Sequence, residues 1–203
     1  MADADMNRLM DHARIRLPGA LDAAIQMELF VVLKEFFSGS NCWYEDIAFT
    51  ANPTDSDVWA DPDAYTYDLI PCDGTITRLI HVVDGSGRTI KASMPHPGTL
   101  LLAYAPSEPE TYTARVALTV VDPVTREGYP QFPDWLLHRY FEDILDGLLG
   151  RMMSQLAKPY SAPQVAAVHL RKFKQAIQKA KVEASRQNVY GAQNWRFPKG
   201  FAN

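Results

Sequence analysis

Residues 18–44 read PGALDAAIQMELFVVLKEFFSGSNCWY, and the period of this segment largely sets the architecture. Its apolar residues recur at spacings of three and four, which predicts a helix over residues 18–37 with one apolar face. The members of this face are Leu21, Ile25, Leu29, Val32, Leu33 and Phe36. Pro18 suits the first helical position, and Gly39 is placed for a left-handed cap. The run Leu29–Leu33 is apolar almost all round, so we expect this helix to be buried on more than one side.

The middle of the chain changes to the period of β-strands. Short runs of β-branched and aromatic residues alternate there with turn clusters rich in Gly, Pro and Asp. The expected strands are 43–50, 65–70, 75–83, 88–93, 99–105 and 111–121. Asp84-Gly85 lies between two of them and indicates a tight hairpin turn. The spacing predicts an antiparallel sheet or a small sandwich.

The last third of the chain returns to helical spacing. A first helix opens at Phe132-Pro133-Asp134-Trp135 and extends to about Leu156. Gly147 and Gly150 weaken this helix and would allow a neighbouring helix to approach closely.

A second long helix follows after a short loop. Ser161 is its expected N-cap, Pro163 lies in its first turn, and it runs to about Gln187. Its expected apolar seam is Val165, Val168, His169, Phe173, Ile177 and Ala180. Lys and Arg fill the opposite side, and the short loop predicts an antiparallel helix hairpin.

These elements predict an α+β fold. We expect a helical bundle, made of one N-terminal long helix and a C-terminal helix hairpin, with an inserted antiparallel β region and an extended C-terminal arm. The helical body would comprise residues 1–50 and 130–187, the β insertion 51–129, and the arm 188–203. The polar, charged residues before Pro18 are unlike a signal peptide, and no run of about 18 apolar residues predicts a transmembrane helix. We therefore expect no membrane association.

Charge is distributed unevenly along the 203 residues, whose net charge is −4. Residues 1–110 hold seven basic and 17 acidic residues, a net charge of −10. Residues 151–203 hold ten basic residues and one acidic residue, a net charge of +9. Such asymmetry often marks an interaction surface, although a solvated helix face is the alternative. The expected subunit-interface residues are Arg171, Lys172, Lys174, Lys179, Lys181 and Arg186.

The arm, residues 188–203, has no periodicity but holds four aromatic residues. Disordered tails are normally poor in aromatic residues. The composition therefore predicts a segment that docks in a groove, either of a partner or of the chain itself. The arm residues expected to bind a partner are Tyr190, Trp195, Arg196, Phe197 and Phe201.

Catalytic motifs are absent from the sequence. It contains no phosphate loop, dinucleotide-binding glycine motif, nucleophile elbow or zinc-protease motif. His138 and Glu142 are better explained as a surface pair than as half of a metal site. Cys42 has no local catalytic signature and is expected to be a buried thiol. An acidic cluster fails the ligand spacing of a calcium loop; its members are Asp55, Asp57, Asp61 and Asp63. We expect no enzyme activity, no metal and no cofactor.

Nucleic-acid binding is the main alternative to a protein–protein role. The basic residues of the last helix could contact phosphates, and the aromatic residues of the arm could stack on bases. The acidic remainder of the chain would repel a duplex, however, and no sequence-reading motif is visible.

The order of elements over residues 18–203 resembles that of the head-to-tail adaptor, or connector, proteins of short-tailed bacteriophages. Phe132-Pro133-Asp134-Trp135-Leu136 opens a long helix, which is followed by a short loop and a charged helix near Pro163. This is similar to the adaptor pattern of a proline before an aromatic-rich helix, then a loop and a polar helix. Leu21–Phe37 followed by Cys42-Trp43-Tyr44 resembles the first long adaptor helix and the aromatic strand after it.

The resemblance implies a structural virion protein that forms a homo-oligomeric ring, a dodecamer, between the portal protein and the tail nozzle protein. The arm would reach the portal, and the β region would meet the nozzle. Viral DNA would pass through the ring without sequence-specific binding. The protein would be located in the neck of the virion and in the host cytoplasm during assembly. Contact between an acidic body and a basic helix fits a head-to-tail ring, and another phage neck or tail-completion protein is the alternative.

Overall fold

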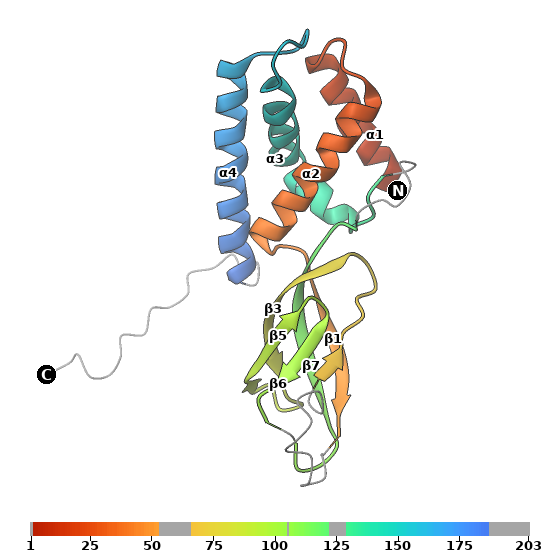
Figure 1. Cartoon of the computed structure of the whole chain (residues 1–203), viewed down its shortest axis with the longest axis vertical. Coiled ribbons are helices and arrows are strands. Elements are labelled where there is room, and N and C mark those ends of the chain that lie inside the picture. The colour runs from red at the N-terminus through yellow and green to blue at the C-terminus, as the bar shows by residue number, and fades with distance from the viewer. Residues whose placement is uncertain (1, 53–65, 105, 122–128, 187–203) are drawn as a thin grey trace, which may run out of the picture.

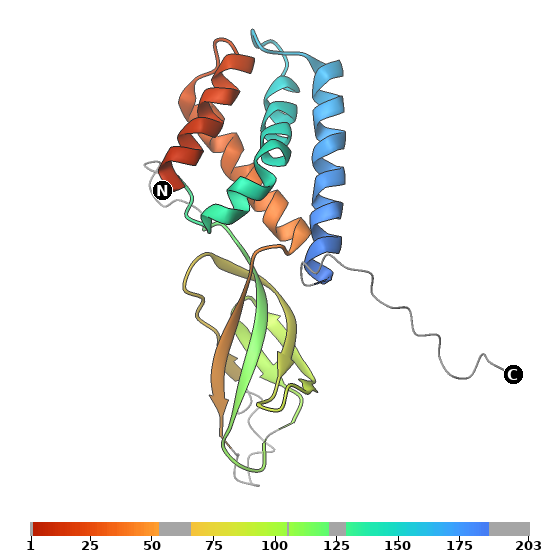
Figure 2. The ribbon, with the colours of Figure 1, turned by 180° about the vertical axis from the view of Figure 1, so that it is seen from behind.

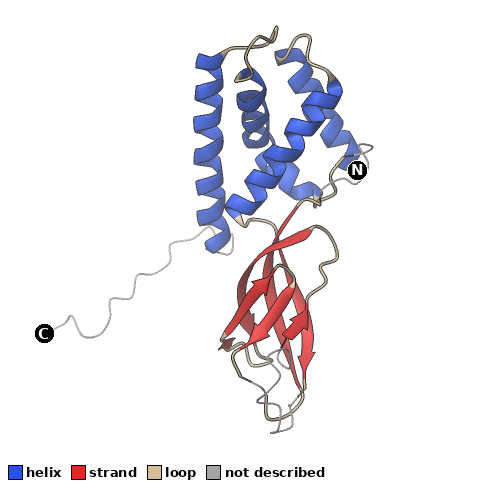
Figure 3. Ribbon diagram, in the orientation of Figure 1, coloured by secondary structure: helices blue, strands red, loops and turns tan. Residues whose placement is uncertain are grey.

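The computed structural model describes residues 2–52, 66–104, 106–121 and 129–186. Helices lie at one end of an elongated molecule and strands at the other (Figures 1 and 3). The helices are α1 (Ala2–Arg16), α2 (Asp22–Ser40), α3 (Asp134–Met153) and α4 (Pro163–Ser185). The strands are β1 (Tyr44–Ala51), β2 (Thr66–Asp68), β3 (Thr75–Val83), β4 (Thr89–Ile90), β5 (Ala92–His96), β6 (Thr99–Leu102) and β7 (Glu110–Thr119).

The strands form two antiparallel sheets. One sheet has the strand order β1-β7-β3-β4 and the other has the order β2-β6-β5. In the larger sheet β7 is central, and it pairs Tyr112 with Phe49 of β1 and Val116 with Leu79 of β3. The two sheets meet through aromatic rings, because the Phe49 ring lies 5.0 Å from that of Tyr67 and 5.7 Å from that of Tyr112, centroid to centroid. The strands therefore enclose a small sandwich-like core.

The predicted fold class is wrong. Over the described residues the chain forms four helices, two of them N-terminal, and two antiparallel sheets. It is therefore not a bundle of one N-terminal helix and a C-terminal hairpin with one inserted β region. In the sequence of α1, charged residues mask a helical stripe whose members are all buried: Met6, Leu9, Met10, Ala13 and Leu17. The first strand also begins at Tyr44, inside the range 1–50 that the sequence pattern assigns to the helical part.

The end of α2 also differs from the prediction. The helix continues to Ser40, and its left-handed cap is Asn41, with a φ of 53°. Gly39 lies inside the helix, where a Cβ would stand 2.9 Å from Cγ2 of Ile177 in α4. The glycine thus allows two helices to approach each other, and an asparagine, which tolerates the left-handed region, ends the helix.

The predicted hairpin at Asp84-Gly85 is confirmed, since β3 pairs with β4 across it. The Asp84 carboxylate accepts hydrogen bonds from the backbone N–H groups of Ser86 and Arg88. The positive φ of the turn, 80°, is at Gly87. An Asx-type turn therefore organises this loop.

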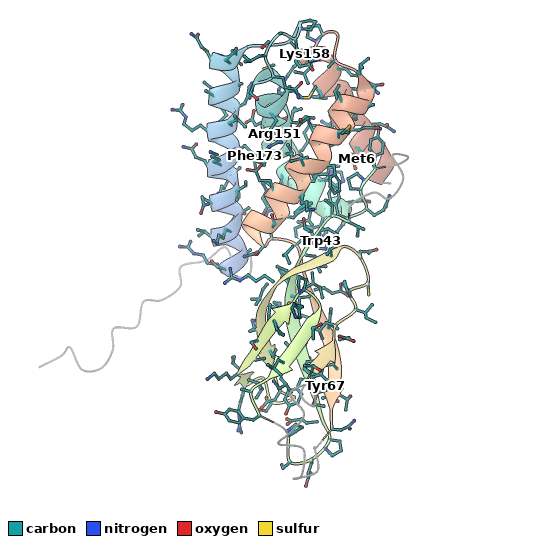
Figure 4. All side chains as sticks on the ribbon, in the orientation of Figure 1. Met6, Trp43, Tyr67, Arg151, Lys158 and Phe173 are labelled. Atoms are coloured by element: carbon teal, nitrogen blue, oxygen red, sulfur yellow. The ribbon has the colours of Figure 1, made fainter. Side chains whose placement is uncertain are left out.

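Phe37, Trp43 and Phe132 form an aromatic cluster, which we call the aromatic junction. It joins the helices to the larger sheet (Trp43 is labelled in Figure 4). The Phe37 ring at the end of α2 lies 5.5 Å from Trp43 and 5.1 Å from Phe132. The backbone carbonyl of Trp43 accepts a hydrogen bond from the N–H of Leu118 in β7. Gly74, with a φ of 80°, packs so closely that a Cβ would lie 2.7 Å from Cη2 of Trp43. Helices and sheets therefore share one continuous core.

Substitution of Leu9 by alanine tests the place of α1 in that core. Leu9 is fully buried, so the cavity left by Leu9→Ala should lower the free energy of unfolding by about 2–5 kcal/mol. Ile15 lies on the same helix but is 81% exposed, and Ile15→Ala should change it by about 0.5 kcal/mol or less. Urea unfolding followed by circular dichroism measures both. Equal effects would contradict the packing of α1.

Candidate protein interface on helix α4

Helix α4 packs against α3 and α2 with one side only (Figures 1 and 2). The packed side is made of Ala166, Phe173, Ala176, Ile177 and Ala180. Two members of the predicted seam, Val165 and Val168, are instead 47% and 44% exposed. Alanine brings the backbones of neighbouring helices closer than valine does, and hydrophobic spacing alone does not distinguish the two.

Close approach of α3 and α4 depends on two glycines of α3. A Cβ at Gly147 would lie 2.6 Å from Cδ2 of the buried Phe173 and 2.8 Å from Cγ1 of Val32 in α2 (Phe173 is labelled in Figure 4). A Cβ at Gly150 would lie 2.8 Å from Cγ of Leu170. The prediction that these glycines allow close helix packing is confirmed.

Polar contacts across the α3–α4 seam fix the rotation of α4 about its axis. Nη2 of Arg139 and the hydroxyl of Tyr140 both donate to Oε2 of Glu183, at 3.0 and 3.3 Å. About four turns away along α4, Nδ1 of His169 lies 2.6 Å from Oδ1 of Asp146. Glu183 is the only acidic residue of α4, and these contacts turn it toward α3. The side of α4 that faces solvent therefore keeps its positive charge.

The six basic residues predicted as interface candidates are all exposed. We call them the basic face: Arg171, Lys172, Lys174, Lys179, Lys181 and Arg186. Residues seven apart share one side of a helix, so Lys172 and Lys179 form one row and Lys174 and Lys181 form a second. Arg171 lies between the two rows by the same spacing.

Most of the basic face has no counter-charge among the residues that the structure describes. Lys179 is the exception, because it lies near Asp143 of α3, where burial raises the pKa of the carboxyl and Lys179 opposes that rise. The other five residues have no ion pair within the described parts of the chain. Such a face is suited to an acidic protein surface or to phosphate groups.

A second exposed surface, absent from the sequence prediction, lies at the end of the helices remote from the sheets (Figure 1). Here the α1–α2 and α3–α4 loops lie side by side, and a Cβ at Gly19 would be 3.5 Å from Cγ of Pro159. Ile15, Leu21 and Leu156 are 81%, 75% and 78% exposed there. We call these three the apolar tip. The helical spacing assigns Leu21 and Leu156 to helices, whereas both lie in loops, so only the structure reveals this surface.

The predicted partner-binding residues of the arm lie outside the described residues, as does the acidic cluster. The former are Tyr190, Trp195, Arg196, Phe197 and Phe201, and the latter are Asp55, Asp57, Asp61 and Asp63. Helix α4 ends at Ser185, near the larger sheet (Figure 1).

The described residues offer little to a catalytic or metal site. Cys42 is the buried thiol that was predicted, and burial raises its pKa to about 11, which keeps it protonated and unreactive. Nε2 of His138 lies 3.2 Å from Oδ2 of Asp5 in α1. No group of three or more His, Cys, Asp or Glu within these residues could hold a metal ion. In the same part of the chain, no helix has the length and apolar character needed to span a bilayer.

The chain matches no protein-family model. No curated protein matches its sequence either. Function must therefore be inferred from the basic face, the apolar tip and the shape of the molecule.

Substitution of Gly147 tests the packing that presents the basic face. The methyl group of Gly147→Ala would push Phe173 and Val32 away from α3. Overpacking of this kind lowers the free energy of unfolding by about 1–3 kcal/mol. The higher helix propensity of alanine offsets roughly 1 kcal/mol of this loss. We expect a lower urea midpoint. Gly85→Ala is the matched control, because a Cβ there meets no atom within 4 Å. A Gly147→Ala protein as stable as the control would contradict the close approach.

Proposed function

We propose that this chain is a structural, non-enzymatic assembly protein, which acts as the head-to-tail adaptor of a short-tailed bacteriophage. The observation that carries the proposal is the basic face, which runs along a helix packed on one side only. A face of cations, most of them without an ion pair among the described residues, lies beside the exposed Val165 and Val168 and is suited to contact with another subunit.

A ring requires two different contact surfaces on each subunit. Helix α4 lies on one side of the helical part and α1 on the opposite side (Figures 1 and 2), so one neighbour could meet each side. Residues 1–110, with their net charge of −10, would supply the acidic counterpart of the basic face. Contact between the basic face and an acidic surface of the neighbour would favour head-to-tail pairing over pairing of like surfaces.

The two ends of the elongated molecule would serve two further partners. The apolar tip lies at one end and the two sheets at the other (Figure 1). In the proposed assembly, a dodecameric ring in the virion neck, the sheets meet the tail nozzle protein and the arm binds the portal protein. Viral DNA passes through the ring without sequence-specific contacts, and the ring is assembled in the host cytoplasm.

Charge reversal on the basic face tests self-assembly. Lys172→Glu with Lys179→Glu should turn attraction to an acidic neighbour into repulsion, so the concentration needed for half-assembly should rise at least tenfold, measured by chromatography with light scattering. Arg88→Glu with Lys91→Glu, exposed in the β part, makes the same charge change and should leave assembly unaltered. If both pairs assemble like the unaltered chain, the basic face is not the subunit interface.

Nucleic-acid binding is the second candidate, since the six exposed cations of the basic face could equally contact phosphates. Five or more phosphate contacts would give a slope of about −4 or steeper in a plot of log affinity for duplex DNA against log salt concentration. Such a slope, lost on the same charge reversal, would favour this candidate over the adaptor. Absence of DNA binding at low salt would exclude it.

The arm can be tested in the full-length chain. Trp195→Ala with Phe197→Ala removes two of the expected aromatic anchors, and loss of such anchors typically weakens an interface by at least about 2 kcal/mol. We expect loss of portal binding in a pull-down while light scattering still reports assembly of the variant with itself. Unchanged portal binding would refute the role of the arm.

A further inference from the structure

A cavity of about 280 Å³ lies where the end of α4 meets the larger sheet. Five elements or their ends line it, namely α2, β1, β3, β7 and α4. Four of its lining side chains are cationic or can become so: Arg78, His81, Arg115 and Lys181. No acidic side chain of the described residues lines it.

Irregular pairing of β3 brings two of these side chains to one face of the sheet. Arg78 and His81 are three residues apart, a spacing that would place them on opposite faces of a regular strand. The register shifts between Leu79 and His81, so that Arg78 pairs with Ala117 and His81 with Arg115 of β7. Positions 115 and 117 share a face, and therefore so do their partners. Bulges commonly re-aim side chains in this way.

Arg115 is held in place and largely neutralised. Its Nε and Nη2 donate to Oδ1 and Oδ2 of Asp46, both at 2.6 Å. Its guanidinium also lies 4.8 Å from the centroid of the Tyr44 ring. The bidentate bond lowers the pKa of the Asp46 carboxyl, so this pair stays ionised near neutral pH. The pair therefore forms a fixed wall of the cavity.

The other cations are available to a ligand. Within the described residues, Arg78 and Lys181 have no ion pair, and they approach the cavity from β3 and α4. The lining thus holds an excess of two positive charges. Unpaired cations that converge from separate elements indicate a site for an anion.

Size and lining favour a carboxylate side chain over a nucleic-acid backbone. At about 280 Å³ the cavity is at the lower end of the roughly 300–1,000 Å³ typical of small-molecule sites. Its cations line a single small cavity, whereas a nucleic acid presents phosphates in a row. Ile80 and Ala184 also line the cavity and could cover the methylene groups of a glutamate. Arginine offers a planar fork that matches a carboxylate.

We propose that this cavity is a binding site for an acidic polypeptide segment, which inserts a glutamate or aspartate side chain between Arg78 and Lys181. The site goes beyond the assembly role described above, because it requires neither ring formation nor a phage partner. Of its cationic residues, only Lys181 belongs to the basic face.

A labelled hexaglutamate peptide, followed by fluorescence anisotropy at low salt, tests the proposal. Arg78→Gln and Lys181→Gln should each weaken binding about tenfold or more, as expected for loss of a charge-assisted bond. Lys174→Gln is the matched control, since it lies in the same row of α4, loses the same charge and does not line the cavity. It should weaken binding less than twofold. Thermal unfolding of each variant checks that these exposed substitutions leave the fold intact.

Three results would overturn the proposal. One is a failure of the unaltered protein to bind the peptide. Another is an equal loss in all three variants, which would show attraction to the helix as a whole. The third is tighter binding of a single-stranded oligonucleotide with the same number of charges, lost with Arg78→Gln and Lys181→Gln, which would assign the cavity to phosphate.

Discussion

The edge-to-face and tilted packing of Phe37, Trp43 and Phe132 is the contact on which the rest of the molecule depends. These rings come from the end of α2, the start of β1 and the approach to α3, so they lie at both chain crossings between helices and sheets, from α2 to β1 and from β7 to α3. Aromatic side chains bury more apolar surface than any others, and their edge-to-face packing fixes relative orientation. Because α4 packs on α2 and α3, and the junction joins these helices to the larger sheet, the end of α4 lies against that sheet and closes the cavity.

Each exposed surface follows from this arrangement. Glycines at the α3–α4 contact let α4 lie close to its neighbours along a narrow seam, so most of its circumference remains free. The bonds of Glu183 to Arg139 and Tyr140 remove the one acid of α4 from solvent. The result is a helix that is structural on one side and strongly cationic on the other. Together with the apolar tip, this gives the molecule distinct lateral and terminal surfaces, which the proposed assembly role would require.

The sequence predicted local features better than global ones. Three features were predicted from the sequence because each depends on near neighbours in the chain. They are the strand over 75–83, the turn at Asp84 and the exposed cations of α4. Helix α1 was not, since its stripe of Met6, Leu9 and Met10 is interrupted by charges that the folded helix turns outward. The cavity could not have been predicted at all. The cavity depends on a shift of register in β3. No residue type in the sequence predicts which strand will contain a bulge or which helix end will lie against that strand.

The position of Gly74 restricts how the sequence of this protein can change during evolution. Its φ of 80° excludes most side chains, and the indole of Trp43 fills the space where a Cβ would lie. Conformation and volume therefore restrict the same position independently, so a second mutation cannot easily rescue the first. Surfaces that bind partners can diverge quickly, whereas a glycine trapped beneath a tryptophan cannot. Distant relatives too dissimilar to align should still carry this pair, which makes it a landmark for finding them.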